Sequence, residues 1–336
     1  MFNARKVLEF KGGSLSSTTL MESVLGELFV RKTISLVENR EYGFQRWYSQ
    51  MKRIQRFSLL FPGLFPKVIR FGRDGDLGYF DLTYFPNAVN AQAYVDECRD
   101  QYKLQRFFDL LLAQMEKMHR IKFPSCSGGI DLYVFEEVEQ KLRDCKSHQA
   151  FSAFLEYDYL IFNGETVPSF VRNLDLYMEL CKRFYVDQDE SYTHGNMTLE
   201  NILFDPESDR IIFIDPYEEN IIDSPLAELS QLLQSVNSRY EVYNARIASI
   251  EGNEISLLAP ASPGLDMFNE MLGSYIAGNY SADDRIMISL FEVSQFIRML
   301  PFKMNVDPNK MFFFYGLASW LFERLLVENS LKELAQ

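Results

Sequence analysis

The sequence of 336 residues predicts an α+β protein with two lobes, a small β-rich N-terminal lobe and a large, mostly helical C-terminal lobe. Within residues 5–85, short apolar runs alternate with turn residues, and one helical pattern lies among them. From Asn90 onward the apolar residues follow helical spacing, except in a loop with two short strands inside residues 192–216. The change of pattern predicts one lobe over residues 1–88 and a second over residues 89–336.

The first lobe begins with three predicted strands. KVLEF is a short alternating run, GGSLSSTT is a turn of small residues, and LMESVLGELFVRKTI gives two apolar runs on either side of Gly26, which is typical of a hairpin. Residues 38–58 then carry apolar side chains at the spacing of an amphipathic helix. Two further strands are expected in KVIRFG and DLGYFDLTYF, the second of which stops at Pro86.

The second lobe is expected to consist mainly of helices. One helical face ends near His119, and two or three more helices are expected within residues 132–185. Helices resume at Leu226 and cover much of residues 284–332, while SIEGNEISLL around Gly252 indicates a small inserted hairpin. The helices after about residue 265 are expected to shape an acceptor pocket.

Composition limits the partners, the cysteine chemistry and the location that are expected for this chain. The net charge is −13, from 34 basic and 47 acidic residues, which argues against a nucleic-acid partner. The four cysteines (Cys98, Cys126, Cys145, Cys181) have no paired spacing, so neither a zinc site nor a disulfide framework is expected. We find no signal-peptide pattern and no apolar run of the roughly 18 to 20 residues that a membrane span needs. The expected location is the cytoplasm.

The most informative segment is YTHGNMTLENILFDPESDRIIFIDP, residues 192–216. Asn201 offers a neutral carbonyl oxygen at the end of a loop, and Asp215 offers a carboxylate at the end of the strand IIFI. Oxygen ligands of this kind are those that Mg²⁺ prefers, and the flanking strands would hold them rigidly. The segment therefore predicts a site for a metal ion and a nucleotide, with Asn201 and Asp215 as the metal ligands.

In these motifs the chain resembles the aminoglycoside phosphotransferase and choline kinase branch of the protein-kinase-like fold. That family has His-Gly-Asp, four residues, Asn, then Ile-Asp at a strand end; here the residues are His194-Gly195-Asn196, Asn201 and Ile214-Asp215. DSPLAELSQLL is similar to the family's Asp-Pro-x-x-Asp-Leu-Ala helix start, with Glu228 in the place of its aspartate, and QMEKMH is similar to its Leu-His helix end. The resemblance implies ATP and Mg²⁺ as cofactors.

The resemblance extends more loosely to the phosphate-binding part of the first lobe. Gly12, Gly13 and Ser14 are expected to form the turn that covers the phosphates, because small residues let backbone N–H groups approach an anion. FVRKTI resembles the third strand of the family, with Lys32 as the residue that pairs with the α- and β-phosphates. Arg31 is the alternative, one residue away in register.

Two more elements of the nucleotide site follow from the same resemblance. Lys32 needs a partner glutamate on the following helix, for which Glu41 is the first candidate and Glu38 the second. Tyr84 and Phe85 fall in the connector between the lobes, where family members hold the adenine.

The catalytic loop departs from the family at one residue, since Asn196 stands where the family has its catalytic aspartate. An amide cannot take up a proton at neutral pH, although its oxygen still accepts a hydrogen bond. The expected catalytic residues are Asn196, which would orient the acceptor hydroxyl, and His194, which would brace the loop. Glu200 and Asp223 are nearby acids that could substitute for the missing base.

Three functions follow. The first is an ATP-dependent phosphotransferase acting on a hydroxyl of a small molecule, a sugar or an amino alcohol, and slowed by Asn196. The second is a pseudokinase that binds a nucleotide and serves as an interaction module with a protein partner. The third is a nucleotidyl transferase. The presence of both Asn201 and Asp215 favours metal and nucleotide binding in all three.

Overall fold

The computed structural model describes residues 4–10, 16–37, 40–125, 128–217 and 220–332. The chain divides into two compact units. Unit 1 consists of Met1–Tyr94, Leu110–Met118 and His194–Asn220, and unit 2 consists of Val95–Asp109, His119–Thr193 and Ile221–Gln336. Two helices, α2 (Ala91–Glu97) and α3 (Gln101–His119), contribute residues to both units. The lobe boundary between residues 88 and 89 remains a prediction.

The described residues of unit 1 contain an antiparallel sheet with the strand order β1-β2-β3-β5-β4. Its strands are β1 (Ala4–Phe10), β2 (Ser16–Ser23), β3 (Leu28–Ser35), β4 (Val68–Asp74) and β5 (Leu77–Thr83). The hairpin predicted around Gly26 is confirmed, because β2 and β3 pair and Gly26 has a φ of 80°. Glycine adopts a positive φ at little cost, since it has no Cβ, so this turn is encoded locally.

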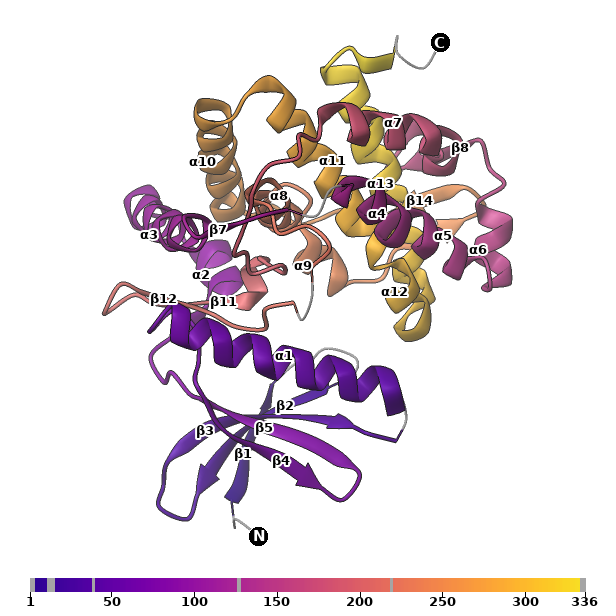
Figure 1. Cartoon of the computed structure of the whole chain (residues 1–336). Coiled ribbons are helices and arrows are strands. Elements are labelled where there is room, and N and C mark those ends of the chain that lie inside the picture. Colours follow the sequence, from indigo (N-terminus) through magenta and orange to yellow (C-terminus); the bar gives the residue numbers. More distant parts are fainter. Residues whose placement is uncertain (1–3, 11–15, 38–39, 126–127, 218–219, 333–336) are drawn as a thin grey trace. The chain divides into compact units, whose positions relative to one another are not determined.

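One helix, α1 (Arg40–Leu60), lies along a face of this sheet, as Figure 1 shows. It confirms the helix predicted for residues 38–58. Its apolar stripe packs against the sheet because residues three and four apart share one side of a helix. The core formed between them comprises Ile34, Trp47, Met51, Ile54, Phe80 and Leu82. This packing decides which side chains of β3 face the helix and which face away.

A second, smaller sheet in unit 1 has the order β12-β11-β6. Its strands are β6 (Val89–Asn90), β11 (Ile202–Asp205) and β12 (Arg210–Phe213). β11 and β12 form an antiparallel hairpin, and nearly all of its apolar side chains are buried. It confirms the two short strands predicted within residues 192–216. A short 3₁₀ turn, η3 (Leu199–Asn201), leads directly into β11.

Helices make up most of the described part of unit 2. They are α4 (Gly129–Val134), α5 (Gln140–Cys145), α6 (Gln149–Phe154), α7 (Leu174–Phe184), α8 (Pro225–Val236), α9 (Tyr240–Asn244), α10 (Pro263–Asn279), α11 (Ala282–Arg298), α12 (Leu300–Val306) and α13 (Pro308–Glu328). A π-helical turn, η1 (Phe135–Glu139), joins α4 to α5, and a 3₁₀ turn, η2 (Phe170–Asn173), precedes α7. α11 is central, because it contacts α7, α8 and α13 and most of its side chains are buried.

The helices expected within residues 132–185 are confirmed, but the segment also contains a hairpin that was not predicted. A hairpin of β8 (Tyr159–Phe162) and β9 (Glu165–Pro168) interrupts them. Its turn is Asn163-Gly164, with φ values of 49° and 87°, which is the backbone that an Asn-Gly hairpin turn requires.

The hairpin predicted around Gly252 is confirmed as β13 (Ser249–Glu251) and β14 (Glu254–Ser256). It joins β8 and β9 in a four-stranded sheet of order β13-β14-β8-β9. Two further strands among the described residues of this unit, β7 (Lys122–Phe123) and β10 (Glu190–Ser191), pair with each other.

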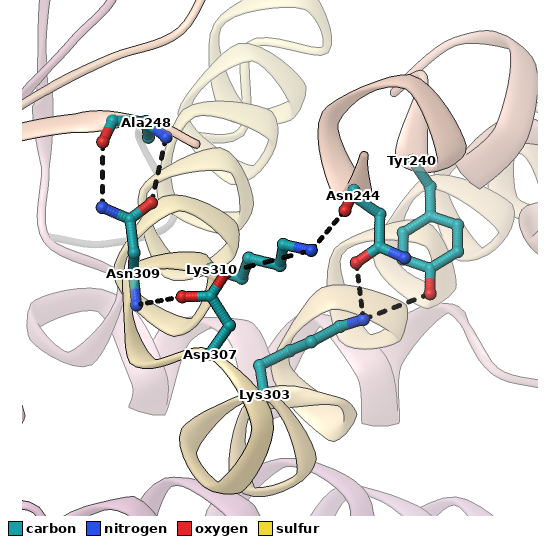
Figure 2. A network of polar contacts seen from close by, with 7 residues as sticks. All are labelled: Tyr240, Asn244, Ala248, Lys303, Asp307, Asn309 and Lys310. Atoms are coloured by element: carbon teal, nitrogen blue, oxygen red, sulfur yellow. Dashed lines mark hydrogen bonds and ion pairs between the residues drawn. The ribbon is translucent and has the colours of Figure 1, made fainter. Parts of the chain in front are cut away.

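A polar network fixes the short helix α9 within unit 2 (Figure 2). The buried Lys303 Nζ of α12 donates to Asn244 Oδ1 at 2.8 Å and to the hydroxyl of Tyr240 at 3.3 Å. Near the start of α13, Asn309 exchanges two 2.9 Å hydrogen bonds with the backbone of Ala248. The side chains thus tie α9 and the segment after it to α12 and α13. Within the described ranges, no helix combines the length and apolar character that crossing a bilayer requires.

Candidate active site

The two predicted metal ligands flank the hairpin of β11 and β12 at its open end, one before the first strand and one after the second. β11 pairs with β12 in the register Ile202 to Phe213, so the residues just outside, Asn201 and Ile214, lie opposite each other. The N–H of Ile214 donates to the carbonyl of Asn201 at 2.9 Å, which extends the ladder by one step. Asp215 follows immediately. The hairpin register therefore brings the predicted ligands together from positions 14 residues apart in the chain.

Asn201 is 8% exposed, and its amide group is oriented by the loop that precedes it. Its Nδ2 donates to the carbonyl of Asn196 at 2.9 Å and to Thr198 Oγ1 at 3.0 Å. A primary amide has two N–H donors, so both are used inside the loop. The carbonyl oxygen Oδ1 is the atom of this side chain that remains for a ligand outside the loop. Thr198 was not selected from the sequence, although its place three residues before Asn201 is typical of a hydroxyl that bonds within a turn.

Asp215 has a φ of 55°, in the left-handed region that non-glycine residues seldom adopt. Strain of this kind persists only where the surrounding structure enforces it, and it is common at functional sites. Its carboxylate Oδ1 lies 2.5 Å from Lys32 Nζ, and the side chain is 32% exposed. Gln50 Nε2 of α1 donates to the carbonyl of the next residue, Pro216, at 3.5 Å.

The structure distinguishes between the two basic residues of β3. Lys32 faces the same side as Ile34 and reaches Asp215, whereas Arg31 faces the other side. Arg31 makes two hydrogen bonds to the buried carboxylate of Asp81, at 2.7 and 2.9 Å. The hydrogen bond to Asp81 raises the pKa of Arg31. Arg70 pairs with the same carboxylate, so Arg31 belongs to a separate ion-pair cluster.

His194 is fully buried and both of its ring nitrogens bond to the backbone of the site. Nε2 donates to the carbonyl of Ile214 at 2.8 Å, and Nδ1 accepts from the N–H of Asn196 at 3.3 Å. Since a carbonyl can only accept and an N–H can only donate, these bonds fit the neutral tautomer with its hydrogen on Nε2. The ring also stacks on Phe65, with centroids 6.0 Å apart. This geometry fits the expected bracing role.

The loop turns sharply at Gly195, whose φ is 77°. This positive φ favours glycine, and a Cβ at this position would lie 2.3 Å from Asn220 Oδ1, so that the Asn220 side chain would have to shift. The next residue, Asn196, is half-buried, and its backbone is held at three points: its N–H by His194, and its carbonyl by the N–H of Thr198 and by Asn201 Nδ2. The backbone beneath the Asn196 side chain is therefore well defined.

The other predicted nucleotide-site residues are less fully described. Gly12, Gly13, Ser14 and Glu38 lie outside the described residues. Glu41 belongs to α1, but its side chain is also outside them, so the proposed partner of Lys32 stays a prediction.

The predicted connector residues follow β5 and are both half-buried. The ring of Phe85 lies beneath the guanidinium of Arg210, 4.9 Å from ring centroid to Cζ. Tyr84 immediately precedes it in the chain. Their contact with adenine stays a prediction.

Of the two acids considered as replacements for the missing base, Glu200 is exposed on η3. Asp223 belongs to unit 2, where its carboxylate accepts a hydrogen bond from the hydroxyl of Thr193. The two helix motifs singled out by the resemblance also meet in unit 2. His119, at the end of α3, pairs through Nε2 with the buried carboxylate of Glu228 on α8.

The sheet with one covering helix, the helical second unit and the hairpin carrying Asn201 and Asp215 together define a protein-kinase-like architecture. No protein-family model matches the chain, and no curated protein matches its sequence. Solved structures do match it across nearly its whole length.

Three solved structures illustrate the likeness. A protein assigned as a fructosamine-3-kinase of Haemophilus somnus 129PT has a TM-score of 0.55 at 11% identity, covering 95% of this chain and 90% of that one. A mutant aminoglycoside 2'-phosphotransferase-IIIa in complex with GDP has a TM-score of 0.51 at 12% identity, covering 98% and 93%. An aminoglycoside phosphotransferase of Alicyclobacillus acidocaldarius subsp. acidocaldarius DSM 446 has a TM-score of 0.50 at 11% identity, also covering 98% and 93%.

At such low identity these likenesses establish the fold. The chain has a two-lobed α+β fold like that of these kinase and phosphotransferase structures, as the sequence motifs predict.

Proposed function

We propose that this protein is an ATP-dependent phosphotransferase that transfers the γ-phosphoryl group to a hydroxyl of a small molecule, a sugar or an amino alcohol. The observation that carries the proposal is the convergence of Lys32, Asn201 and Asp215 within unit 1, although they come from distant parts of the chain. A buried ammonium, an amide oxygen and a carboxylate are the groups that phosphoryl transfer asks of a protein.

The comparisons support the same class of reaction. The structures with this fold include proteins named as a fructosamine-3-kinase and as aminoglycoside phosphotransferases, and one of them is in complex with GDP. These names fit a nucleotide as the donor and a small hydroxylated molecule as the acceptor.

The donor set fits Mg²⁺. Asp215 offers a carboxylate that is partly exposed, and the loop orients Asn201 so that its carbonyl oxygen remains for a ligand. Both are hard oxygen ligands on rigid elements. When bound, Mg²⁺ supplies positive charge that offsets the charge developing on the transferred phosphoryl group.

In this proposal each residue of the chain has a stated task. Lys32 Nζ holds phosphate oxygens of the nucleotide, because a buried ammonium favours a nearby anion. Asn196 accepts a hydrogen bond from the acceptor hydroxyl and orients it. His194 keeps the loop in place through its bonds to Ile214 and Asn196. The hydroxyl proton leaves to solvent or to another carboxylate, since the amide of Asn196 cannot bind it.

Asn196 also favours a second candidate, a pseudokinase that binds the nucleotide without transferring its phosphate. General-base assistance is typically worth about 10²- to 10⁴-fold in rate, and this chain lacks the usual base. We rank the slow enzyme first, because Lys32, Asn201 and Asp215 together serve phosphate and metal handling.

A thermal-shift titration with ATP and Mg²⁺ tests the proposal on the wild type and on Asp215→Ala. We expect the nucleotide to raise the melting temperature of the wild type and to do so much less in the variant, because the carboxylate ligand is lost. Glu207→Ala is the matched control, since it removes an exposed acid from the turn of the same hairpin. No shift in any of the three proteins would rule out a nucleotide site.

Product analysis then separates the reactions. Release of ADP that depends on an added sugar or amino alcohol supports phosphoryl transfer. Release of pyrophosphate would instead support nucleotidyl transfer, and binding without either product would support the pseudokinase.

A further inference from the structure

Lys32 and Asp215 form an ion pair in which the side chains of both residues are held in place. Lys32 Nζ lies 2.5 Å from Asp215 Oδ1, and only 6% of Lys32 is exposed. Only 7% of the Lys32 side chain is exposed, so its ammonium has little access to solvent. Asp215 is held equally firmly, because its left-handed backbone follows a buried strand. The pair is therefore a defined feature of the structure.

This ion pair places a positive charge against one oxygen, Oδ1, of the carboxylate that a metal ion would use. A divalent cation that bound to Asp215 with Lys32 in place would lie within a few ångströms of the ammonium. Like charges at about 4 Å repel strongly in the partly shielded environment near a protein surface. Burying the ammonium without its carboxylate partner is also unfavourable, since a buried charge needs a counter-charge. A cation alone would have to overcome both effects.

We propose that Lys32 acts as an electrostatic gate on Asp215, so that a divalent cation binds there only together with a polyphosphate. The phosphate oxygens offer the ammonium a new anionic partner, which releases the Asp215 oxygen for the cation. Asn201 plays no part in the gate, because its orientation is set by its own bonds to Asn196 and Thr198. The inference rests on the proposed function in one respect, the identity of the metal site.

Titration with Mn²⁺ alone tests the gate without any nucleotide or any turnover. Mn²⁺ takes the same oxygen ligands as Mg²⁺, and the paramagnetic resonance signal of the free aqueous ion measures how much remains unbound. In the wild type we expect little binding at the site. In Lys32→Met the ammonium is gone and the stem is replaced by an apolar side chain of similar length, so the affinity for Mn²⁺ should rise at least about tenfold.

Two controls assign the gain to the site. Lys32→Met combined with Asp215→Asn should lose the added binding, because the carboxylate is missing. Lys52→Met removes the same charge from an exposed position of α1 and should leave Mn²⁺ binding as in the wild type. Lys32→Gln is a second uncharged variant that guards against misfolding of the first, and a melting curve for each protein reports its folding.

The outcomes separate the gate from the proposed function. If Lys32→Met and Lys32→Gln are folded and bind Mn²⁺ no better than the wild type, the gate is wrong. It is equally wrong if the wild type alone binds Mn²⁺ at Asp215 as tightly as these variants do. If Mn²⁺ binding rises as expected but ATP with Mg²⁺ fails to stabilise the wild type, the block of Asp215 by Lys32 stands, whereas its release by a nucleotide and the nucleotide-dependent function both fail.

Discussion

Two buried lysines, one in each unit, have different surroundings. Lys32 in unit 1 is 6% exposed and ends on the carboxylate of Asp215, whose own side chain is 32% exposed. Lys303 in unit 2 is 5% exposed and donates to the amide oxygen of Asn244 and the hydroxyl of Tyr240. The first lysine leads to an atom that a ligand can reach. The second joins two helices.

The aromatic environment of Lys303 strengthens the contrast. The ring centroids of Tyr240, Phe302 and Phe314 lie 5.2, 5.5 and 5.6 Å from its Nζ. Rings at such distances stabilise a cation through their negative faces, so the charge is satisfied inside the unit. Burial of a lysine is therefore not in itself the mark of a site. What marks Lys32 is a partner that is partly exposed and held on a left-handed backbone.

Asn196→Asp should have the largest effect of these changes, and the effect should be on the rate of the reaction at the site in unit 1. If the protein is a kinase that lacks its base, a carboxylate at this position should raise turnover by about 10²- to 10⁴-fold. ATP turnover with a panel of sugars and amino alcohols measures the gain, and Asn196→Ala, which supplies no base, is the control. A rate that stays at the wild-type level would mean that position 196 is not where a base is missing.

Glu292 extends the comparison to a buried acid of unit 2. Burial on α11 raises its pKa to about 7, against hydrogen bonds from Ser238 and Asn237 that favour the charged form. Because the pKa is higher in the folded state, the folded protein binds the proton more tightly. Wild-type stability should therefore fall as pH rises from about 4.5 to about 7, by on the order of 3 kcal/mol.

Glu292→Gln keeps an oxygen that accepts both hydrogen bonds and removes the charge. It should be similar to the wild type in stability at pH 4.5 and more stable at pH 8, as measured by urea unfolding. Parallel pH profiles for the two proteins would show that this carboxyl does not titrate on unfolding.

Substitutions of the two lysines themselves have the smallest expected effects and test the comparison most directly. Lys303→Met removes the donor of two buried hydrogen bonds and should lower the free energy of unfolding by about 2 kcal/mol. Lys32→Met should change it by less than about 1 kcal/mol, because Asp215 is partly exposed and can be hydrated. Urea unfolding of both variants checks the order, and a reversed order would remove the distinction between the two lysines.

Local sequence was sufficient for much of unit 1. The turn at Gly26, the helix α1 and the hairpin between Asn201 and Asp215 all depend on short-range signals, namely a glycine with positive φ, helical spacing and two short apolar strands. The same kind of signal is present at Asn163-Gly164, between two short apolar runs, although no hairpin was predicted there. That hairpin was predictable, because Asn-Gly is a strong turn signal.

The sequence by itself determined the residue types of the candidate site and their spacing along the chain, since a loop followed by a hairpin is a local structure. Only the tertiary structure decided which basic residue of β3 reaches Asp215. Successive side chains of a strand point to opposite faces, so Lys32 and Arg31 could be told apart only once α1 had packed on one face. The pairing of His119 with Glu228 likewise required two distant helices to meet, because no local rule joins residues 109 positions apart.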